Sequence, residues 1–308
     1  MTSTSDGVDA RPTSDAGPIP NIFSVDVEEW FHILEIDELP QVDTWQGLET
    51  RVDRNFRILL DECEAAGIKM TCFFLGWVAE RYPDLVKEAV ARGHEISSHG
   101  HMHQLIYTQT AEEFGADLLR SREVLQELSG QPVLGYRAPG FSIVETTPWA
   151  FDEIAGAGFT YDSSIFPTSR GHGGLTDAIA TPHVITTKNG PLLEFPIPVV
   201  SYLGRRICFF GGGYLRLFPY SLIKRMAARV NASGQPVVYY IHPREIDPGH
   251  PRLPMSRRRR FKTYVNLSTT HGKLQAIMAE GHVTSFGDWI AQRGGTLPVM
   301  PEATRQAS

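Results

Sequence analysis

Three histidines occupy alternate positions in the segment EISSHGHMH, which runs from Glu95 to His103. His99 and His103 are four residues apart, a spacing that puts two imidazoles on one face of a helical turn or tight loop. Imidazole is a favourable ligand for Zn, Co, Ni or Fe, and two histidines with one carboxylate leave coordination positions open for water and substrate. The spacing indicates a metal site, and a His-rich polar loop is the alternative. His101, between them, is expected to face away or to support the site from behind.

Two carboxylates, Asp26 and Glu28, stand at the end of a buried strand predicted over NIFSVDV, residues 21–27. Successive side chains of a strand alternate between its two faces, so Asp26 and Glu28 share one face while Val27 points away. One carboxylate is suited to binding a metal and the other to taking a proton from water. The alternative is that Asp26 only caps the strand or forms a turn.

Arg137 and His242 also stand at the ends of predicted strands, in the segments YRAPGF and PVVYYIH. A guanidinium at such a place either bridges its own loop through an ion pair or fixes an aspartate and keeps it ionised. A histidine after an apolar strand is either a satisfied core residue or a general acid toward a leaving amine.

These residues need a framework that brings separate strand ends together, and the alternation of predicted elements supplies one. Repeated strand–helix units imply a parallel sheet with helices outside, and roughly seven of them favour a TIM-like barrel. In such a barrel Asp26, the histidines, Arg137, Asp162 and His242 all converge beyond the carboxyl ends of the strands. Strands are predicted at 21–27, 69–76, 94–98, 132–136, 160–165, 192–197, 236–242 and 283–286, and helices at 51–67, 77–93, 110–130, 147–159, 219–234 and 271–281.

The composition is that of an ordinary globular protein of 308 residues, with 42% hydrophobic and 21% charged residues. The net charge of -6 provides no basic field for nucleic acid. One basic run, Arg257 to Arg260, is predicted to be a solvated surface turn, with a phosphate or weak peripheral membrane contact as the alternative. The three cysteines form no disulfide framework and indicate a reducing compartment, and Cys63 and Cys72 are expected to pack in the core.

The two ends of the chain are predicted to be tails. Residues 1–20 are polar and rich in Ser, Asp and Pro, and they contain no apolar stretch typical of a secretory signal, which favours a cytoplasmic location. Residues 291–308 are predicted as a C-terminal tail. No run of about eighteen apolar residues is present, so no transmembrane segment is expected.

Taken in order, the segments SVDVEEWF, SHGHMH, RAPGF and YYIHP resemble the polysaccharide deacetylase family with the NodB homology domain, also called carbohydrate esterase family 4. Matching segments run from about Asn21 to about Phe286. VDVEEWF, YRAPGFSI, FTYDSSIFP, GGGYLRLFPY and HPREIDP are similar to a subfamily linked to exopolysaccharide and exosortase gene clusters. The combination is specific, although each segment alone is not.

The resemblance implies that residues 21–290 form a distorted (β/α)7 TIM-like barrel with a subfamily-specific C-terminal elaboration. It implies a divalent metal, usually Zn²⁺ with Co²⁺ or Ni²⁺ as alternatives, held by His99 and His103. It further implies Asp26 as the base, Arg137 as the residue that orients this base, and His242 as the acid that protonates the departing amine.

This chain departs from the commonest family pattern, in which two adjacent aspartates occur and the second binds the metal. Val27 occupies that second place. Glu28 is therefore the expected carboxylate ligand, with Asp26 as the alternative.

Three further residues are expected to contact the substrate: Tyr214, Pro139 and Asp162. For Asp162, pairing with Arg137 or capping a strand are the alternatives. The glycines of FFGGGY, at 211–213, are not followed by Lys-Ser or Lys-Thr, so they do not indicate a phosphate loop. They are expected to allow a sharp backbone path near the cleft.

The function predicted from these features is a metal-dependent hydrolase. It would remove N-acetyl groups from amino sugars of a polysaccharide, or of its lipid- or nucleotide-linked precursor, in exopolysaccharide biosynthesis. One alternative is an amidohydrolase of the same fold that opens another carbon–nitrogen bond, such as that of a cyclic ureide. The other is a catalytically inactive barrel that only binds carbohydrate, which Val27 would also fit.

Overall fold

The computed structural model describes residues 20–34, 40, 42–169, 173–202 and 204–293. The tails predicted at 1–20 and 291–308 lie almost entirely outside these residues. No helix within the described ranges is long and apolar enough to cross a membrane.

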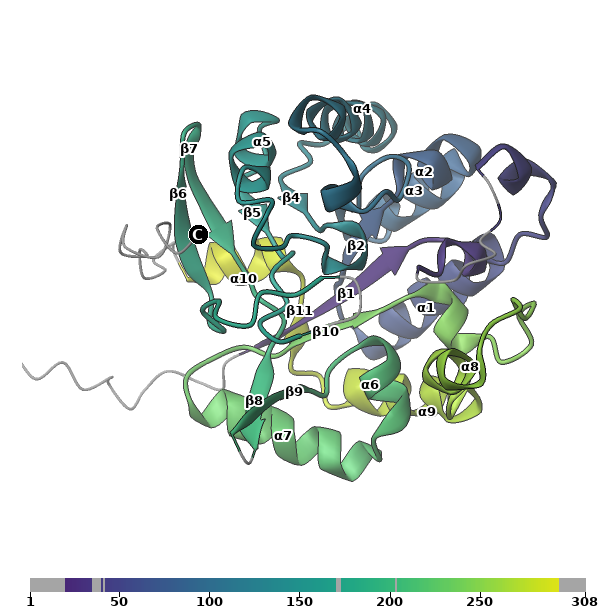
Figure 1. Cartoon of the computed structure of the whole chain (residues 1–308). Helices are drawn as coiled ribbons and strands as arrows, with labels where there is room; N and C mark the ends of the chain where they lie inside the picture. Colours follow the sequence, from purple (N-terminus) through teal and green to yellow (C-terminus); the bar gives the residue numbers. More distant parts are fainter. Residues whose placement is uncertain (1–19, 35–39, 41, 170–172, 203, 294–308) are drawn as a thin grey trace, which may run out of the picture.

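A largely parallel sheet forms the centre of the protein (Figure 1). Seven strands follow one another in parallel in the order β10, β1, β2, β3, β4, β5 and β7, and β6 pairs antiparallel with β7. The chain also contributes a short strand, β11, beside β1, and a separate two-stranded hairpin of β8 and β9. The strands are β1 (Asn21–Val27), β2 (Thr71–Phe74), β3 (Glu95–Ser98), β4 (Gly135–Tyr136), β5 (Tyr161–Asp162), β6 (His183–Thr187), β7 (Gly190–Glu194), β8 (Val199–Tyr202), β9 (Arg205–Cys208), β10 (Val238–Ile241) and β11 (Val283–Thr284).

Helices surround this sheet. In Figure 1, α4 and α5 lie above it, α1 lies to its right, and α7 and α9 lie below. The α-helices of the described chain are α1 (Val52–Ala66), α2 (Gly76–Arg81), α3 (Pro83–Ala91), α4 (Ala111–Ser129), α5 (Ala150–Gly156), α6 (Gly212–Leu217), α7 (Tyr220–Ala232), α8 (Arg257–Tyr264), α9 (Leu267–Ala279) and α10 (Phe286–Gln292). Short 3₁₀ helices occur at Trp30–His32, Val42–Gly47, Ile106–Thr108, Pro139–Phe141 and Pro243–Ile246. The predicted fold class, a distorted TIM-like barrel of parallel strands with helices outside, is confirmed.

Local sequence signals explain several helix boundaries. Gly67 ends α1 in the left-handed conformation, at a φ of 66°, which glycine adopts without steric cost. Pro83 begins α3 directly after α2, as its fixed φ favours at a first helical position. Thr110 and Glu113 form the predicted capping box at the start of α4.

The alternation of side chains along β1 separates two hydrophobic clusters. Phe23, Val25 and Val27 belong to the larger cluster between the sheet and the helices. Ile22 belongs to the smaller cluster inside the barrel, where it packs with aromatic residues such as Phe73. Full burial of such a side chain contributes about 1.5–3 kcal/mol. Because the two faces alternate, Asp26 points to the interior and Val27 to the helices.

Some elements differ from the sequence-based expectation. The run Arg257–Arg260 was predicted as a surface turn, but it forms the first half of α8, where the Ser256 side chain accepts a hydrogen bond from the Arg259 backbone N–H. Straight-chain arginines lose little rotamer freedom in a helix, which is compatible with this conformation. Cys63 and Cys72 are buried and free, as predicted.

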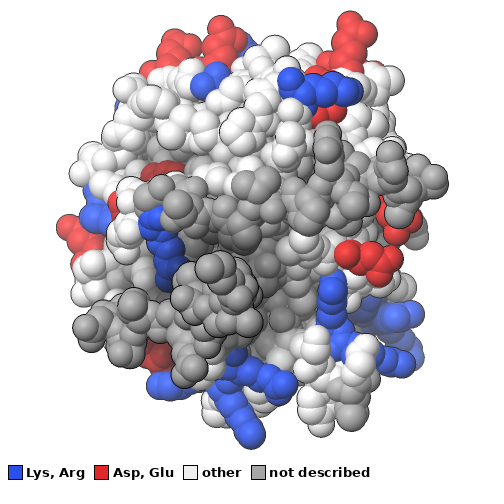
Figure 2. All heavy atoms as spheres, turned by 90° about the vertical axis from the view of Figure 1, so that its left-hand side faces the viewer, with Lys and Arg blue, Asp and Glu red and all other residues white. Residues whose placement is uncertain are grey.

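The charge of the surface is unevenly distributed. On the face drawn in Figure 2, most Lys and Arg side chains lie in the lower half. The overall charge of -6 therefore does not describe every part of the surface.

Candidate functional site

Asp26 and Glu28 lie on the inner side of the sheet where β1 ends, and both are almost completely buried, at 1% and 2% exposure. The next residue, Glu29, points elsewhere and binds the Arg51 and Val52 backbone N–H groups at the start of α1. The predicted sharing of one face by Asp26 and Glu28 thus agrees with their positions.

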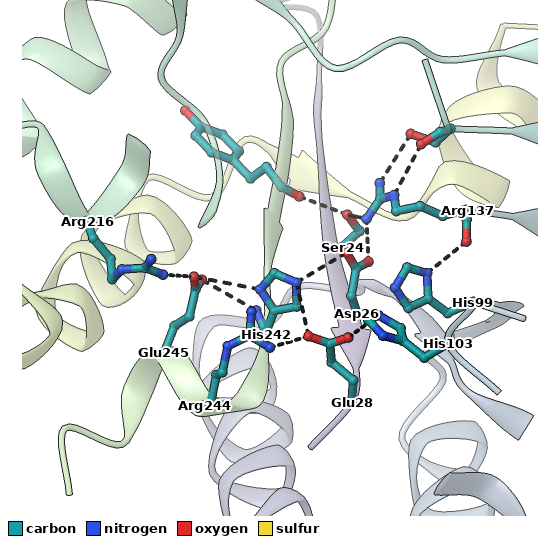
Figure 3. Close-up of polar contacts among 12 residues, drawn as sticks. Ser24, Asp26, Glu28, His99, His103, Arg137, Arg216, His242, Arg244 and Glu245 are labelled. Atoms are coloured by element: carbon teal, nitrogen blue, oxygen red, sulfur yellow. Dashed lines mark hydrogen bonds and ion pairs between the residues drawn. The ribbon is translucent and has the colours of Figure 1, made fainter. Parts of the chain in front are cut away.

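Arg137 holds Asp26 in place. Its Nη1 donates to Oδ1 of Asp26 at 2.6 Å and to Oγ of Ser24 at 2.9 Å, and its Nη2 donates to Ser163 (Figure 3). The guanidinium is fully buried and stacks on the Phe73 ring, 4.2 Å from its centroid. These contacts leave Oδ2 of Asp26 directed toward His242, 3.8 Å from Nε2.

His99, His103 and Glu28 form a cluster that fits a metal ion. One potential ligand atom from each lies within 4.8 Å of the other two, and all three residues are buried. Nδ1 of His99 lies 2.7 Å from the backbone oxygen of Arg137, so Nε2 is the nitrogen left for a ligand bond. Nε2 of His103 lies 2.6 Å from Oε2 of Glu28. Asp26 is not part of this set, which favours Glu28 as the carboxylate ligand.

The loop that carries the histidines is fixed by α4. Asp117 accepts hydrogen bonds from the backbone N–H groups of His101 and Met102, at 2.7 and 3.1 Å. His103 adopts a left-handed φ of 53°, which turns its ring back toward Glu28. His101 points away from the cluster, and its Nε2 lies 3.8 Å from Glu80.

The environment sets the protonation of the cluster. Burial lowers the pKa of His99 to about 4, which keeps its imidazole neutral as a metal ligand requires. Burial opposes ionisation of Glu28, but the nearby His103, Arg244 and His242 outweigh it and hold the pKa of Glu28 well below its ordinary value. The potential metal ligands are therefore two imidazoles and one carboxylate.

His242 lies on the other side of the two carboxylates, at the end of β10. Its Nε2 is 3.5 Å from Glu28, and its Nδ1 is 3.7 Å from Glu245 (Figure 3). Glu245 is fully buried and paired with Arg216, whose charge outweighs the effect of burial and lowers the pKa of Glu245 to about 2. Arg244 pairs with Glu28.

Arg244, Glu245 and Arg216 were not predicted as site residues. The signal for the first two is their position directly after β10, in HPRE, where a short 3₁₀ helix turns them back beside His242. Arg216 comes from α6, a helix that the sequence pattern did not predict.

A cavity of about 610 Å³ contains this cluster. Asp26, Glu28, His99, His103 and His242 line it, and so does Tyr214, as expected for a substrate contact. The predicted close backbone path at 211–213 is also present. A Cβ atom on Gly211 would lie 2.1 Å from the ring of Tyr240, so only glycine fits beside this ring, next to the lining residues Gly212 and Gly213.

Asp162 and Pro139 do not line the cavity with the other predicted residues. Asp162 is fully buried, and it does not pair with Arg137. Burial raises the pKa of Asp162 to about 6, and that of its neighbour Glu194 well above the ordinary value. Besides burial, the charge of Asp162 opposes ionisation of Glu194, as expected for neighbouring carboxyl groups.

The physical role of Asp162 is to support the loop after β4. Its Oδ1 accepts a hydrogen bond from Ser164 Oγ at 2.5 Å, and Ser164 Oγ accepts one from the Ala138 backbone N–H at 2.8 Å. The segment that contains Arg137 and Pro139 is thereby anchored to β5. We had expected Asp162 to contact the substrate directly, but its complete burial outside the cavity does not support that contact.

Comparison with known proteins provides independent information on the chain. Residues 44–160 match the model of the family described as polysaccharide deacetylase, and residues 163–291 match a domain of unknown function (DUF3473). The chain is 29% identical over 96 residues to the peptidoglycan-N-acetylglucosamine deacetylase of Bacillus cereus, a match that covers 31% of this chain and 35% of that protein. The chain thus spans about a third of the length of this curated relative.

Solved structures show the same fold. A probable polysaccharide deacetylase from Pseudomonas aeruginosa superposes with a TM-score of 0.58 at 15% identity, covering 89% of this chain and 91% of that one. PuuE allantoinase gives a TM-score of 0.58 at 17% identity and covers 91% of each chain. At these identities the likeness establishes the fold alone.

Proposed function

We propose that the chain is a metal-dependent hydrolase that removes N-acetyl groups from amino sugars, a function supported by the match of residues 44–160 to the polysaccharide deacetylase family. The observation that carries this proposal is the placement of Glu28, His99 and His103 beside the Asp26–Arg137 pair in one cavity. A metal-ligand set and a fixed carboxylate base are the two parts that hydrolysis of an amide needs.

The residues of the chain divide the proton transfers between them. Arg137 occupies Oδ1 of Asp26, so Oδ2 is the oxygen that accepts a proton from the attacking water. His242 lines the cavity with its Nε2 3.8 Å from that oxygen. It is placed to donate a proton to the nitrogen of the departing amine. Glu245 and Glu28, on either side of its ring, fix the orientation of His242.

Glu28, His99 and His103 would hold the divalent metal, which we propose to be Zn²⁺, since two imidazoles and a carboxylate are a common hydrolytic ligand set. A metal bound there would polarise the acetamide carbonyl and increase the acidity of water. Arg244 supports the ligand Glu28 from outside the cluster, a role typical of residues that orient metal ligands.

We propose that residues 21–290 act as one barrel. The two family models divide at residues 160–163, yet β10 and β11 of the second segment pair directly with β1. His242 therefore reaches the site only because both segments share the sheet. The free, buried cysteines support a reducing compartment such as the cytoplasm, and a role in exopolysaccharide synthesis stays a prediction.

The test is metal content measured together with acetate release. The parent protein and the variants His99→Ala, His103→Ala and His101→Ala are purified without chelator, and acetate release from N-acetylated sugars is assayed on the same samples. We expect about one metal per chain in the parent, loss of metal and acetate release in His99→Ala and His103→Ala, and neither loss in His101→Ala. His101 is the matched control because its ring points to Glu80.

Other outcomes select other functions. Metal without acetate release, but with opening of allantoin in the same panel, would favour an amidohydrolase of the cyclic ureide type. A parent that binds no metal even after Zn²⁺ is added back would contradict the hydrolase and favour a sugar-binding barrel.

A further inference from the structure

One face of α8 forms a wall of the cavity that contains the candidate catalytic residues. Arg258, Phe261, Lys262 and Val265 line this cavity, and their spacing of three, four and seven residues places them on one side of the helical segment. Arg258 and Lys262 are exposed, and the Phe261 side chain is 58% exposed. An exposed aromatic ring between two cations is therefore presented to whatever occupies the cavity.

This helix is held in a fixed position relative to the site. Nη2 of Arg216 donates to the backbone oxygen of Lys262 at 3.0 Å, and the same arginine pairs with Glu245 behind His242. At the end of α8, the Tyr264 hydroxyl accepts a hydrogen bond from the Leu253 N–H. Arg216 thus links α8, which carries the two cations, to Glu245 beside His242.

Among the described residues that line the cavity, cationic side chains outnumber carboxylates. Its three carboxylates, Asp26, Glu28 and Glu245, are each paired with a buried or nearly buried arginine: Arg137, Arg244 and Arg216 respectively. Arg258 and Lys262 form no ion pair with an acidic residue anywhere in the described ranges. Charges of one sign in a cleft with low-dielectric walls concentrate ligands of the opposite sign.

We propose that the acetylated sugar acted on at this site carries a phosphoryl group that Arg258 and Lys262 bind while Phe261 packs against the sugar. This inference rests on the proposed function and narrows its substrate to a glycosyl phosphate or diphosphate. Guanidinium and ammonium groups are the usual protein ligands of phosphate. Four residues of helix span about 6 Å, a separation that suits two neighbouring phosphate groups.

The test compares substrates that share a sugar and differ in charge. Acetate release is measured with N-acetylchitotriose, which is neutral, with UDP-N-acetylglucosamine, and with farnesyl diphosphate-linked N-acetylglucosamine in detergent. The variants are Arg258→Gln/Lys262→Gln and, as a matched control, Arg257→Gln/Arg260→Gln. The control removes the same charge from the same helix at exposed positions that do not line the cavity.

We expect the first double variant to lose about 10–100-fold in kcat/KM on the diphosphate substrates and less than about twofold on the neutral one, because each of the two solvent-exposed charges should contribute about 3–10-fold. The control should change neither by more than about twofold. Higher ionic strength should lower kcat/KM for the diphosphate substrates only, because salt screens the attraction between charges. Preference for the farnesyl or the uridine compound identifies a lipid or a nucleotide as the carrier.

Equal losses on neutral and diphosphate substrates, no loss on either, or equal losses in the two double variants would each overturn the inference. So would binding to phosphatidylglycerol vesicles that both variants lose while diphosphate turnover is unchanged, because α8 would then be a membrane contact.

A binding measurement distinguishes failure of the proposed deacetylase function from failure of the proposed phosphoryl site. Calorimetric titration of UDP-N-acetylglucosamine into the metal-free full chain reports phosphoryl recognition without turnover. A parent that releases no acetate but binds this ligand at least about tenfold more tightly than Arg258→Gln/Lys262→Gln would refute the deacetylase and retain the phosphoryl site. Equal affinities would refute the site itself.

Discussion

The ion pair between Arg137 and Asp26 provides a direct test of how the site is stabilised. In Arg137→Met, an apolar chain replaces the guanidinium and the carboxylate stays. The two side chains are 0% and 2% exposed, with Nη1 and Oδ1 at 2.6 Å. At an effective dielectric constant of about 20, their attraction at this distance is about 6 kcal/mol, and the cost of burying both charges offsets part of it. Removal of one partner from such a pair costs about 3–5 kcal/mol, because the remaining charge is buried without compensation.

The measurement is the free energy of unfolding from urea titrations of metal-free protein at neutral pH. Arg120→Met is the control: this arginine is 54% exposed and pairs with Glu80, so its loss should cost less than about 1 kcal/mol. The double variant Asp26→Asn/Arg137→Met should recover part of the stability, because no lone charge remains. A loss in Arg137→Met no larger than that of the control would refute the reasoning.

Three further predictions concern the surroundings of the site. Glu245→Gln should lower kcat for acetate release by about 10–100-fold with little change in KM, because His242 loses the carboxylate beside its Nδ1; an unchanged kcat would show that Glu245 has no positioning role. Gly211→Ala should lower the free energy of unfolding by about 1–3 kcal/mol, because the new Cβ would overlap the Tyr240 ring, and urea titration measures it. Burial lowers the pKa of His94 from 6.5 to about 4. The neutral, buried imidazole therefore contributes fully to the free energy of unfolding above pH 6.5, and at most about 3 kcal/mol is lost as the pH falls toward 4. Over this pH range the urea midpoint should fall less in His94→Gln than in the parent. Equal falls would show that His94 is not the residue responsible.

The positions of the central strands and of Asp26 were predictable because local periodicity determines them. In β1 the inner face carries Ile22, Ser24 and Asp26, while Phe23, Val25 and Val27 face the helices. The end of each parallel strand faces the same side of the sheet, so residues after β1, β3, β4 and β10 had to meet. The alternation of residues along each strand and the parallel order of the strands were therefore sufficient to predict that Asp26, His99, Arg137 and His242 lie close together.

Elements that depend on tertiary contacts were not predictable in this way. The arginines of α8 have no apolar repeat, and the helix is positioned by Arg216 and by contacts of Tyr264 with Leu253. Asp162 follows a strand like Asp26 does, yet a second carboxyl group, Glu194, occupies its surroundings and turns it into a structural residue. Residue type and strand position are the same in the two cases, and only the partner differs.

The same argument distinguishes the two carboxylates at the end of β1, Asp26 and Glu28, whose roles residue type alone left open. Arg137, 111 residues further along the chain, binds one oxygen of Asp26 and leaves the other for a proton. Arg244, 216 residues further along, holds Glu28 while its second oxygen faces His103. Both carboxylates are paired with an arginine, but only Glu28 has an oxygen beside the two imidazoles, whereas the second oxygen of Asp26 faces His242. The proposed roles of Asp26 as base and Glu28 as metal ligand therefore depend on contacts between distant segments, and exchange of the two roles would require both arginines to change partners.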